Sequence, residues 1–196
     1  MTDGTAYSLG KGDHSVEDIA QRVNAFFLEK YLEGYGESEA SPTLGFFVVG
    51  YSSGNSLAEE YRIVIENGSS TGPEKERDDA DCGISWGGET DAICRLVLGY
   101  SPFIASALLE RGIEEEKISE ILQHFQSKTA IPLVPQAMPI QDAIDLAKFL
   151  ATMTINFSRF TPGAATVGGP VEVAVITKHE GFKWVDRKLY YPRELN

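Results

Sequence analysis

The sequence has few of the side chains that bind metals. Its 196 residues include two cysteines and three histidines. Cys82 and Cys94 are too far apart for a C-x-x-C pair, and a structural zinc site needs four ligands at tighter spacing. Both cysteines lie among apolar residues. We therefore expect them to be reduced, buried and inert, and we assign no metal and no cofactor to the chain.

Basic residues are also scarce. The chain has 17 lysines and arginines against 29 aspartates and glutamates, which gives a net charge of -12. Binding to nucleic acid requires a basic stripe that neutralises phosphates. The sequence contains none, so we do not expect a nucleic-acid partner. Residues 74–81 mix charges of both signs beside Ser, Gly and Pro, and we interpret them as a solvated loop.

Long apolar runs are absent from the sequence. The longest, 44–51 and 171–176, are far shorter than the roughly 20 residues that span a membrane. The first residues lack the basic region and apolar stretch of a secretion signal. We therefore expect a cytoplasmic protein without a membrane partner. Its length and its 42% hydrophobic content predict a single globular domain over 1–196, with 1–14 irregular.

The sequence does contain clear helix and strand patterns. Ser15 and Asp18 have capping-box spacing before an amphipathic helix that ends near Gly34. The apolar run 44–51 and the alternating run 57–68 predict an antiparallel hairpin. Further helices are predicted after Gly87-Gly88, from Pro102 to Leu109, at 114–128 and from Pro139 to Phe160, and strands at 82–86, 171–176 and 182–185. This order predicts an α+β protein with helix-covered sheets.

The longest predicted helix carries its apolar residues at three-and-four spacing. The expected inner face consists of Ile140, Ala143, Ile144, Ala147, Leu150, Ala151 and Thr154. Gly168 and Gly169 follow this helix and lead into a strand in which Val171, Val173 and Val175 point to one side. We expect that strand to be fully buried.

Four segments carry a resemblance to a known family. They are "TLGFFVVGY" (43–51), "AEEYRIVIENGS" (58–69), "ISWGGETDAICRLV" (84–97) and "TVGGPVEVAVIT" (166–177). In this order they resemble the later part of a proteasome-type subunit of the N-terminal-nucleophile (Ntn) hydrolases, over about 15–185. The resemblance implies a helix-covered double β-sheet, an αββα sandwich. It also implies kinship with threonine-type peptidases and amidohydrolases, ring or homo-oligomeric assembly, and a peptide or protein substrate for an active parent.

The resemblance also implies an N-terminal portion that this sequence does not show. Subunits of that family begin with a nucleophilic threonine on their first strand, which a lysine helps to activate. The 14 residues before Ser15 are too few for that first sheet. We therefore expect a truncated chain or one part of a split protein. Thr2 would become N-terminal on removal of Met1, but it and Lys11 lie in a turn-rich segment, so we assign no catalytic residue.

The corners that support the nucleophile in that family also differ here. The resemblance places Gly87 where the family has a hydroxyl, and Ala164 and Val167 where catalytic subunits have Asp and Ser. We therefore expect a chain that is non-catalytic as it stands. Two alternatives are a non-catalytic ring or scaffold subunit, and an unrelated α+β module that binds a ligand or a protein.

Overall fold

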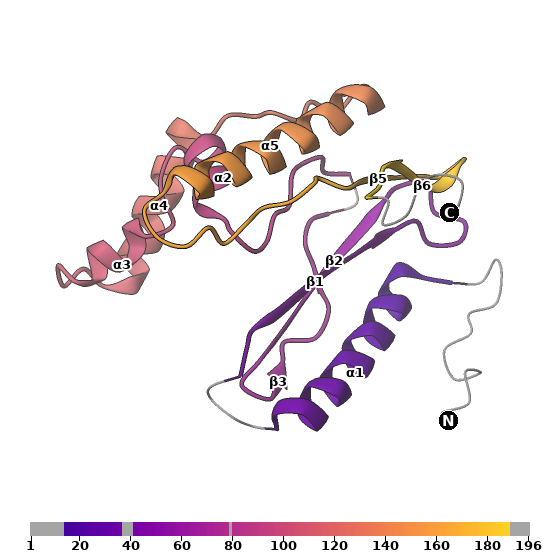
Figure 1. Ribbon diagram of the computed structural model, residues 1–196, viewed down its shortest axis with the longest axis horizontal. Helices are drawn as coiled ribbons and strands as arrows, with labels where there is room; N and C mark the ends of the chain where they lie inside the picture. Colours follow the sequence, from indigo (N-terminus) through magenta and orange to yellow (C-terminus); the bar gives the residue numbers. More distant parts are fainter. Residues whose placement is uncertain (1–13, 37–40, 79, 189–196) are drawn as a thin grey trace. The chain divides into compact units, whose positions relative to one another are not determined.

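The computed structural model describes residues 14–36, 41–78 and 80–188. Within these ranges the chain forms five helices and two small sheets, so the predicted α+β class is confirmed (Figure 1). The chain divides into two compact units, Met1–Asp81 with Ile176–Glu180, and Cys82–Val175 with Gly181–Asn196. We describe each unit by itself. The single domain stays a prediction, and its irregular segment 1–14 lies, except for His14, outside the described residues.

The first unit begins with helix α1, Val16–Tyr35. The Ser15 side chain accepts a hydrogen bond from the Asp18 backbone N–H at 2.9 Å, which satisfies one free donor of the first turn. The helix ends where Gly36 adopts a φ of 64° and donates its N–H to the Leu32 carbonyl. The sequence-based start is confirmed, and the end lies one residue beyond the predicted Gly34.

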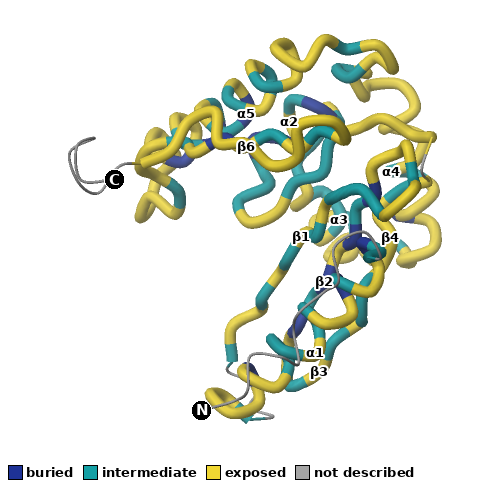
Figure 2. The backbone as a smooth tube through the Cα atoms, turned by 90° about the vertical axis from the view of Figure 1, so that its right-hand side faces the viewer, coloured by how far each residue is buried: buried dark blue, intermediate teal, exposed yellow. Residues whose placement is uncertain are grey.

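Strands β1 (Leu44–Gly50) and β2 (Glu59–Glu66) form the predicted antiparallel hairpin. Its register pairs Leu44 with Ile65 at one end and Gly50 with Glu59 at the other. The alternating residues of β2 separate as expected, with Tyr61, Ile63 and Ile65 buried. Buried positions along β2 appear in dark blue in Figure 2. Helix α1 packs on this face, where Phe27 stacks on Phe46 with 4.4 Å between ring centroids. The predicted helix-covered hairpin is confirmed.

Two short strands extend this sheet. After a turn in which Asn67 and Gly68 both have positive φ, β3 (Ser69–Ser70) pairs with the end of β2. Strand β4 (Glu74–Lys75) pairs with Arg62 and Tyr61. The prediction of a solvated loop over 74–81 is therefore wrong at its start. Strand pairing uses backbone N–H and C=O groups, so the charged side chains of Glu74 and Lys75 do not prevent β4 from pairing with β2.

The second unit is mainly helical. Helices α2 (Asp91–Val97), α3 (Ile104–Leu109), α4 (Glu115–Thr129) and α5 (Ile140–Phe160) agree with the four predicted there. Ile93, Val97 and Leu150 form its buried core between α2 and α5, with Ile84 and Trp86 packed against them. Residues 82–86, however, form no strand, so that prediction is wrong. Ile84 and Trp86 are partly buried against the helical core instead, a packing that apolar residues allow as readily as a sheet.

Strands β5 (Val173–Thr177) and β6 (Gly181–Asp186) form a two-stranded sheet, as the sequence predicted. The expectation of a fully buried strand is wrong, because Val173 is buried but Ala174 and Ile176 are exposed. Strand β6 is exposed along its whole length. Among the described residues no third strand pairs with this sheet.

Two predictions about buried side chains also need correction. Cys94 is buried as expected, but Cys82 is exposed, since the segment that carries it joins no sheet. On α5, Leu150 and Thr154 are buried as predicted. The prediction is wrong for Ile140, which is 59% exposed, and for Ala143 and Ala147, which are also exposed. The inner face starts later along the helix and extends further, to the buried Ser158. No helix in the described ranges is long and apolar enough to cross a bilayer.

Candidate functional site

The two glycine corners of the second unit line one cavity of about 570 Å³. The first corner precedes α2 and the second follows α5, and the cavity lies between them over the inner face of α5. Its wall consists of residues 84–89, Ile93, Ala147, Leu150, Ala151, Thr154, Ile155, Val167, Gly168, Pro170 and Val171. Segments about 80 residues apart in sequence thus meet at one place, which makes this cavity the candidate site.

Backbone conformation explains one glycine in each corner. Gly88 has a φ of 77° and Gly169 a φ of 92°, a region that residues with a Cβ rarely adopt. A Cβ built at either position would meet nothing within 4 Å. The turn, and not a lack of space, therefore requires glycine at both positions.

A chain of hydrogen bonds joins the corners at the edge of the cavity. Thr166 Oγ1 donates to Glu89 Oε2 at 2.9 Å, and the Thr166 backbone N–H donates to Ser158 Oγ at 3.1 Å. The two hydroxyl oxygens are 3.2 Å apart. Because a carboxylate can only accept, the single Thr166 proton goes to Glu89, and the Ser158 hydroxyl must donate to Thr166 Oγ1. The direction of the chain is therefore Ser158 to Thr166 to Glu89.

This chain differs from the one that the resemblance implied. Gly87 and Val167 line the cavity, so two of the three singled-out positions are at the site, but neither has a polar side chain. Ala164 is exposed and does not line it. Thr2 and Lys11, the nucleophile and amine considered from the sequence, lie outside the described residues.

Sequence reasoning missed the polar residues that the site does contain. None of Glu89, Ser158 and Thr166 is singled out from the sequence. The one signal in the sequence is that Ser158 continues the inner face of α5, where the structure buries it eight residues before Thr166. Without the fold it could not be distinguished from a surface serine.

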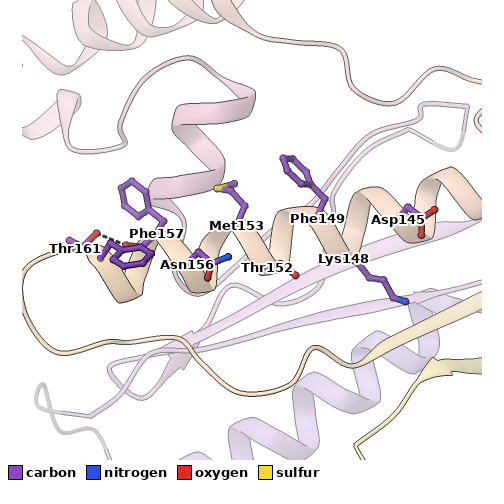
Figure 3. A pocket seen from close by; sticks show the side chains of 9 residues that line it. Asp145, Lys148, Phe149, Thr152, Met153, Asn156, Phe157 and Thr161 are labelled. Atoms are coloured by element: carbon purple, nitrogen blue, oxygen red, sulfur yellow. Dashed lines mark hydrogen bonds between the residues drawn. The ribbon is translucent and has the colours of Figure 1, made fainter.

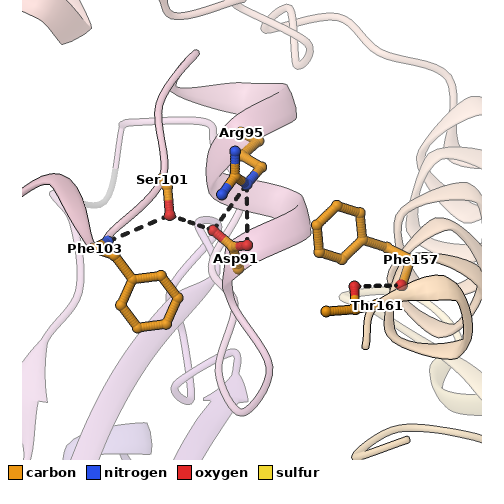
Figure 4. Close-up of polar contacts among 6 residues, drawn as sticks. All are labelled: Asp91, Arg95, Ser101, Phe103, Phe157 and Thr161. Atoms are coloured by element: carbon orange, nitrogen blue, oxygen red, sulfur yellow. Dashed lines mark hydrogen bonds and ion pairs between the residues drawn. The ribbon is translucent and has the colours of Figure 1, made fainter. Parts of the chain in front are cut away.

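A second polar cluster holds the start of α2 against the start of α3 (Figure 4). Arg95 Nε lies 3.0 Å from both carboxylate oxygens of Asp91, and the Ser101 hydroxyl donates to Asp91 Oδ1. Burial alone would raise the pKa of Asp91, but the hydrogen bonds from Ser101 and Arg95 together lower it. Asp91 therefore carries a structural charge, and the Phe103 backbone N–H donates to Ser101 in turn.

A second hollow, of about 820 Å³, lies along another face of α5 (Figure 3). Phe149, Met153 and Phe157 project from the same side of the helix, as their four-residue spacing requires. Lys148, also at this hollow, forms an ion pair with Asp186. Among the described residues that line this hollow, no chain of side-chain hydrogen bonds resembles that of the first cavity. Within the described ranges no three His, Cys, Asp or Glu side chains gather as metal ligands.

Comparison with known proteins returned nothing: no family model matches the chain, and no match was found among curated proteins or solved structures. The resemblance to proteasome-type subunits therefore stays a prediction.

Proposed function

We propose that this chain is a non-catalytic protein of the Ntn-hydrolase fold, related to the threonine-type peptidases and located in the cytoplasm. The proposal is supported by the meeting of the two glycine corners over α5, in the chain order that the resemblance implies. The nonpolar Gly87 and Val167 at this cavity support the absence of catalysis, because activation of a nucleophile needs polar groups there.

The test of this proposal is incubation of the purified chain with a panel of fluorogenic peptides. We expect no turnover by the parent chain or by a Thr2→Ala variant. Turnover by the parent that disappears in Thr2→Ala would overturn the proposal and identify Thr2 as the nucleophile. Turnover in both that co-elutes with the chain through repeated purification would also contradict it, and would place the peptidase elsewhere in the chain.

Within the same proposal, the chain acts as a scaffold subunit that associates with copies of itself. Among the described residues β1 pairs only with β2, so its other edge is open. The strand contains no charged residue, and its outward side chains Phe47 and Val49 are 38% and 45% exposed. In a chain of net charge -12, such an edge is where a second copy can approach without like-charge repulsion.

Light scattering coupled to size exclusion measures this assembly. We expect the parent chain to form a dimer or a larger oligomer, and Val49→Lys to shift it to the monomer. The control is Leu109→Lys, which places the same charge on the exposed end of α3, where the original side chain is 47% exposed. A monomeric parent, or equal effects of the two lysines, would refute assembly through β1.

A second candidate function is an α+β ligand-binding module unrelated to peptidases. The observation that favours it is the cavity itself, which combines apolar walls with the single carboxylate of Glu89.

A further inference from the structure

The carboxylate of Glu89 has unused capacity to bind a cation. Among the described residues, its only hydrogen bond comes from the Thr166 hydroxyl. Among the described residues no Lys, Arg or His forms an ion pair with Glu89. A carboxylate has about four acceptor positions, so most of its capacity is free. A charge that is partly removed from water without a partner is costly, and a cationic ligand would remove that cost.

The other residues of the cavity wall are apolar, or their side-chain polar groups already have an interaction partner. Ile93 and Leu150 are buried at its base, and Trp86 lies beside them. The hydroxyl proton of Thr154 is used in a 2.9 Å bond to the Leu150 carbonyl. The other wall side chains in the described part of the chain carry no cation. The cavity therefore presents one anionic group at the edge of an apolar wall, and its volume of about 570 Å³ is that of a small-molecule site.

We propose that this cavity binds a small organic amine, with its ammonium group on Glu89 and its apolar or aromatic body against Trp86 and α5. The ammonium donates charge-assisted hydrogen bonds to the free lone pairs of the carboxylate. An anion of the same shape meets Glu89 and is repelled, and a neutral alcohol loses the charge assistance. This inference names the ligand class for the second candidate function. It does not depend on the Ntn fold, and its test measures binding rather than hydrolysis or assembly.

Tryptophan fluorescence provides the assay. The chain has two tryptophans, of which Trp86 lines the cavity and Trp184 lies on β6 outside it. In a Trp184→Phe background, the emission of Trp86 is titrated with 2-phenylethylamine, with 2-phenylethanol and with phenylacetate at constant ionic strength. We expect saturable binding of the amine, binding of the alcohol at least tenfold weaker, and none of the acid. A charge-assisted hydrogen bond is worth roughly 1.5 kcal/mol or more, which is about tenfold in Kd.

Matched variants assign the effect to Glu89. Glu89→Gln keeps the shape and an oxygen that can accept from Thr166, so the cavity edge is retained while the charge is lost. We expect this variant to bind the amine about tenfold more weakly and no better than the alcohol. Glu110→Gln makes the same charge change at the exposed end of α3 and should leave the amine affinity unchanged.

A cavity-filling variant provides a second test that does not depend on the carboxylate. Ala151 lines the cavity from α5, and Ala151→Leu should weaken both amine and alcohol while circular dichroism remains unchanged. Three results would overturn the inference: no saturable binding of the amine, equal affinities for amine and alcohol, or an unchanged amine affinity in Glu89→Gln.

Discussion

Replacement of Ile63 by alanine should lower the unfolding free energy of the first unit more than replacement of any exposed residue in the same sheet. Ile63 lies in the middle of β2, is fully buried and pairs in register with Phe46. The change removes three buried carbon atoms, which at about 0.8 kcal/mol each gives a transfer loss of about 2.4 kcal/mol. Because α1 and the hairpin cannot collapse fully into the space, a cavity cost raises the expected loss to about 3–4 kcal/mol.

The assay is urea denaturation followed by far-ultraviolet circular dichroism, with hydrogen exchange of the α1 and β1 amides as a local readout. The control is Leu57→Ala, just before β2, where the side chain is 44% exposed and the expected loss in unfolding free energy is below about 1 kcal/mol. If the two units unfold separately, the loss should be confined to the transition that the α1 amides report. Equal losses for the two variants would refute the assignment of Ile63 to the core.

Three further predictions concern the local structure. Ser15→Ala should lower the unfolding free energy by about 1 kcal/mol by removing the cap of α1, and Ser56→Ala, a change at an exposed loop serine, serves as its control. Gly99→Ala should lower Tm more than Gly112→Ala: both residues have positive φ, but the new Cβ at Gly99 would lie 2.6 Å from Thr129 Cβ, whereas nothing lies within 4 Å at Gly112. Because the pKa of Asp91 is lowered on folding, its stabilisation is present above the ordinary value of 3.8 and is lost as the pH falls through the lower folded pKa. Asp91→Asn should therefore reduce the loss of Tm in this acid range, and an unchanged acid profile would contradict that role.

Most helices and the main hairpin could be predicted because their signals are local. Each signal depends only on neighbours within a few residues. Examples are the cap at Ser15, the alternation along β2 and the periodic face around Leu150. These patterns place the elements to within one or two residues of their positions in the structure. A helix or strand can be predicted without knowledge of its packing partner when its own sequence shows which residues are buried.

The wrong predictions share a physical cause. The apolar run 82–86 could be covered by a sheet or by helices, and the sequence does not say which. The charged pair Glu74–Lys75 joins β2 through backbone groups that no side-chain pattern reveals. Burial of Cys82 and of strand 171–176 was inferred from apolar neighbours alone. In each case the outcome depends on which distant segment covers the residue, and periodicity carries no information about that.

The candidate site shows the same division between local and distant information. Its glycine corners were visible because a positive φ requires a particular residue at a particular position, as at Gly88 and Gly169. The bond between Glu89 and Thr166 spans 77 residues and was not visible. The turns were therefore predictable from the sequence, whereas their meeting at one cavity and its polar content were not.

The polar chain at this site consists of two hydroxyls that end on one carboxylate. Ser158 and Thr166 are hydroxyls that end on the carboxylate of Glu89, yet the Ser158 side chain is buried and its proton is directed at Thr166 rather than into the cavity. Activation of a hydroxyl needs a base of suitable pKa, usually histidine or an amine. No His or Lys lines the cavity in the described part of the chain. The three side chains therefore act as a tie between α5, the last corner and the approach to α2, and the free oxygen positions of Glu89 are left for a ligand.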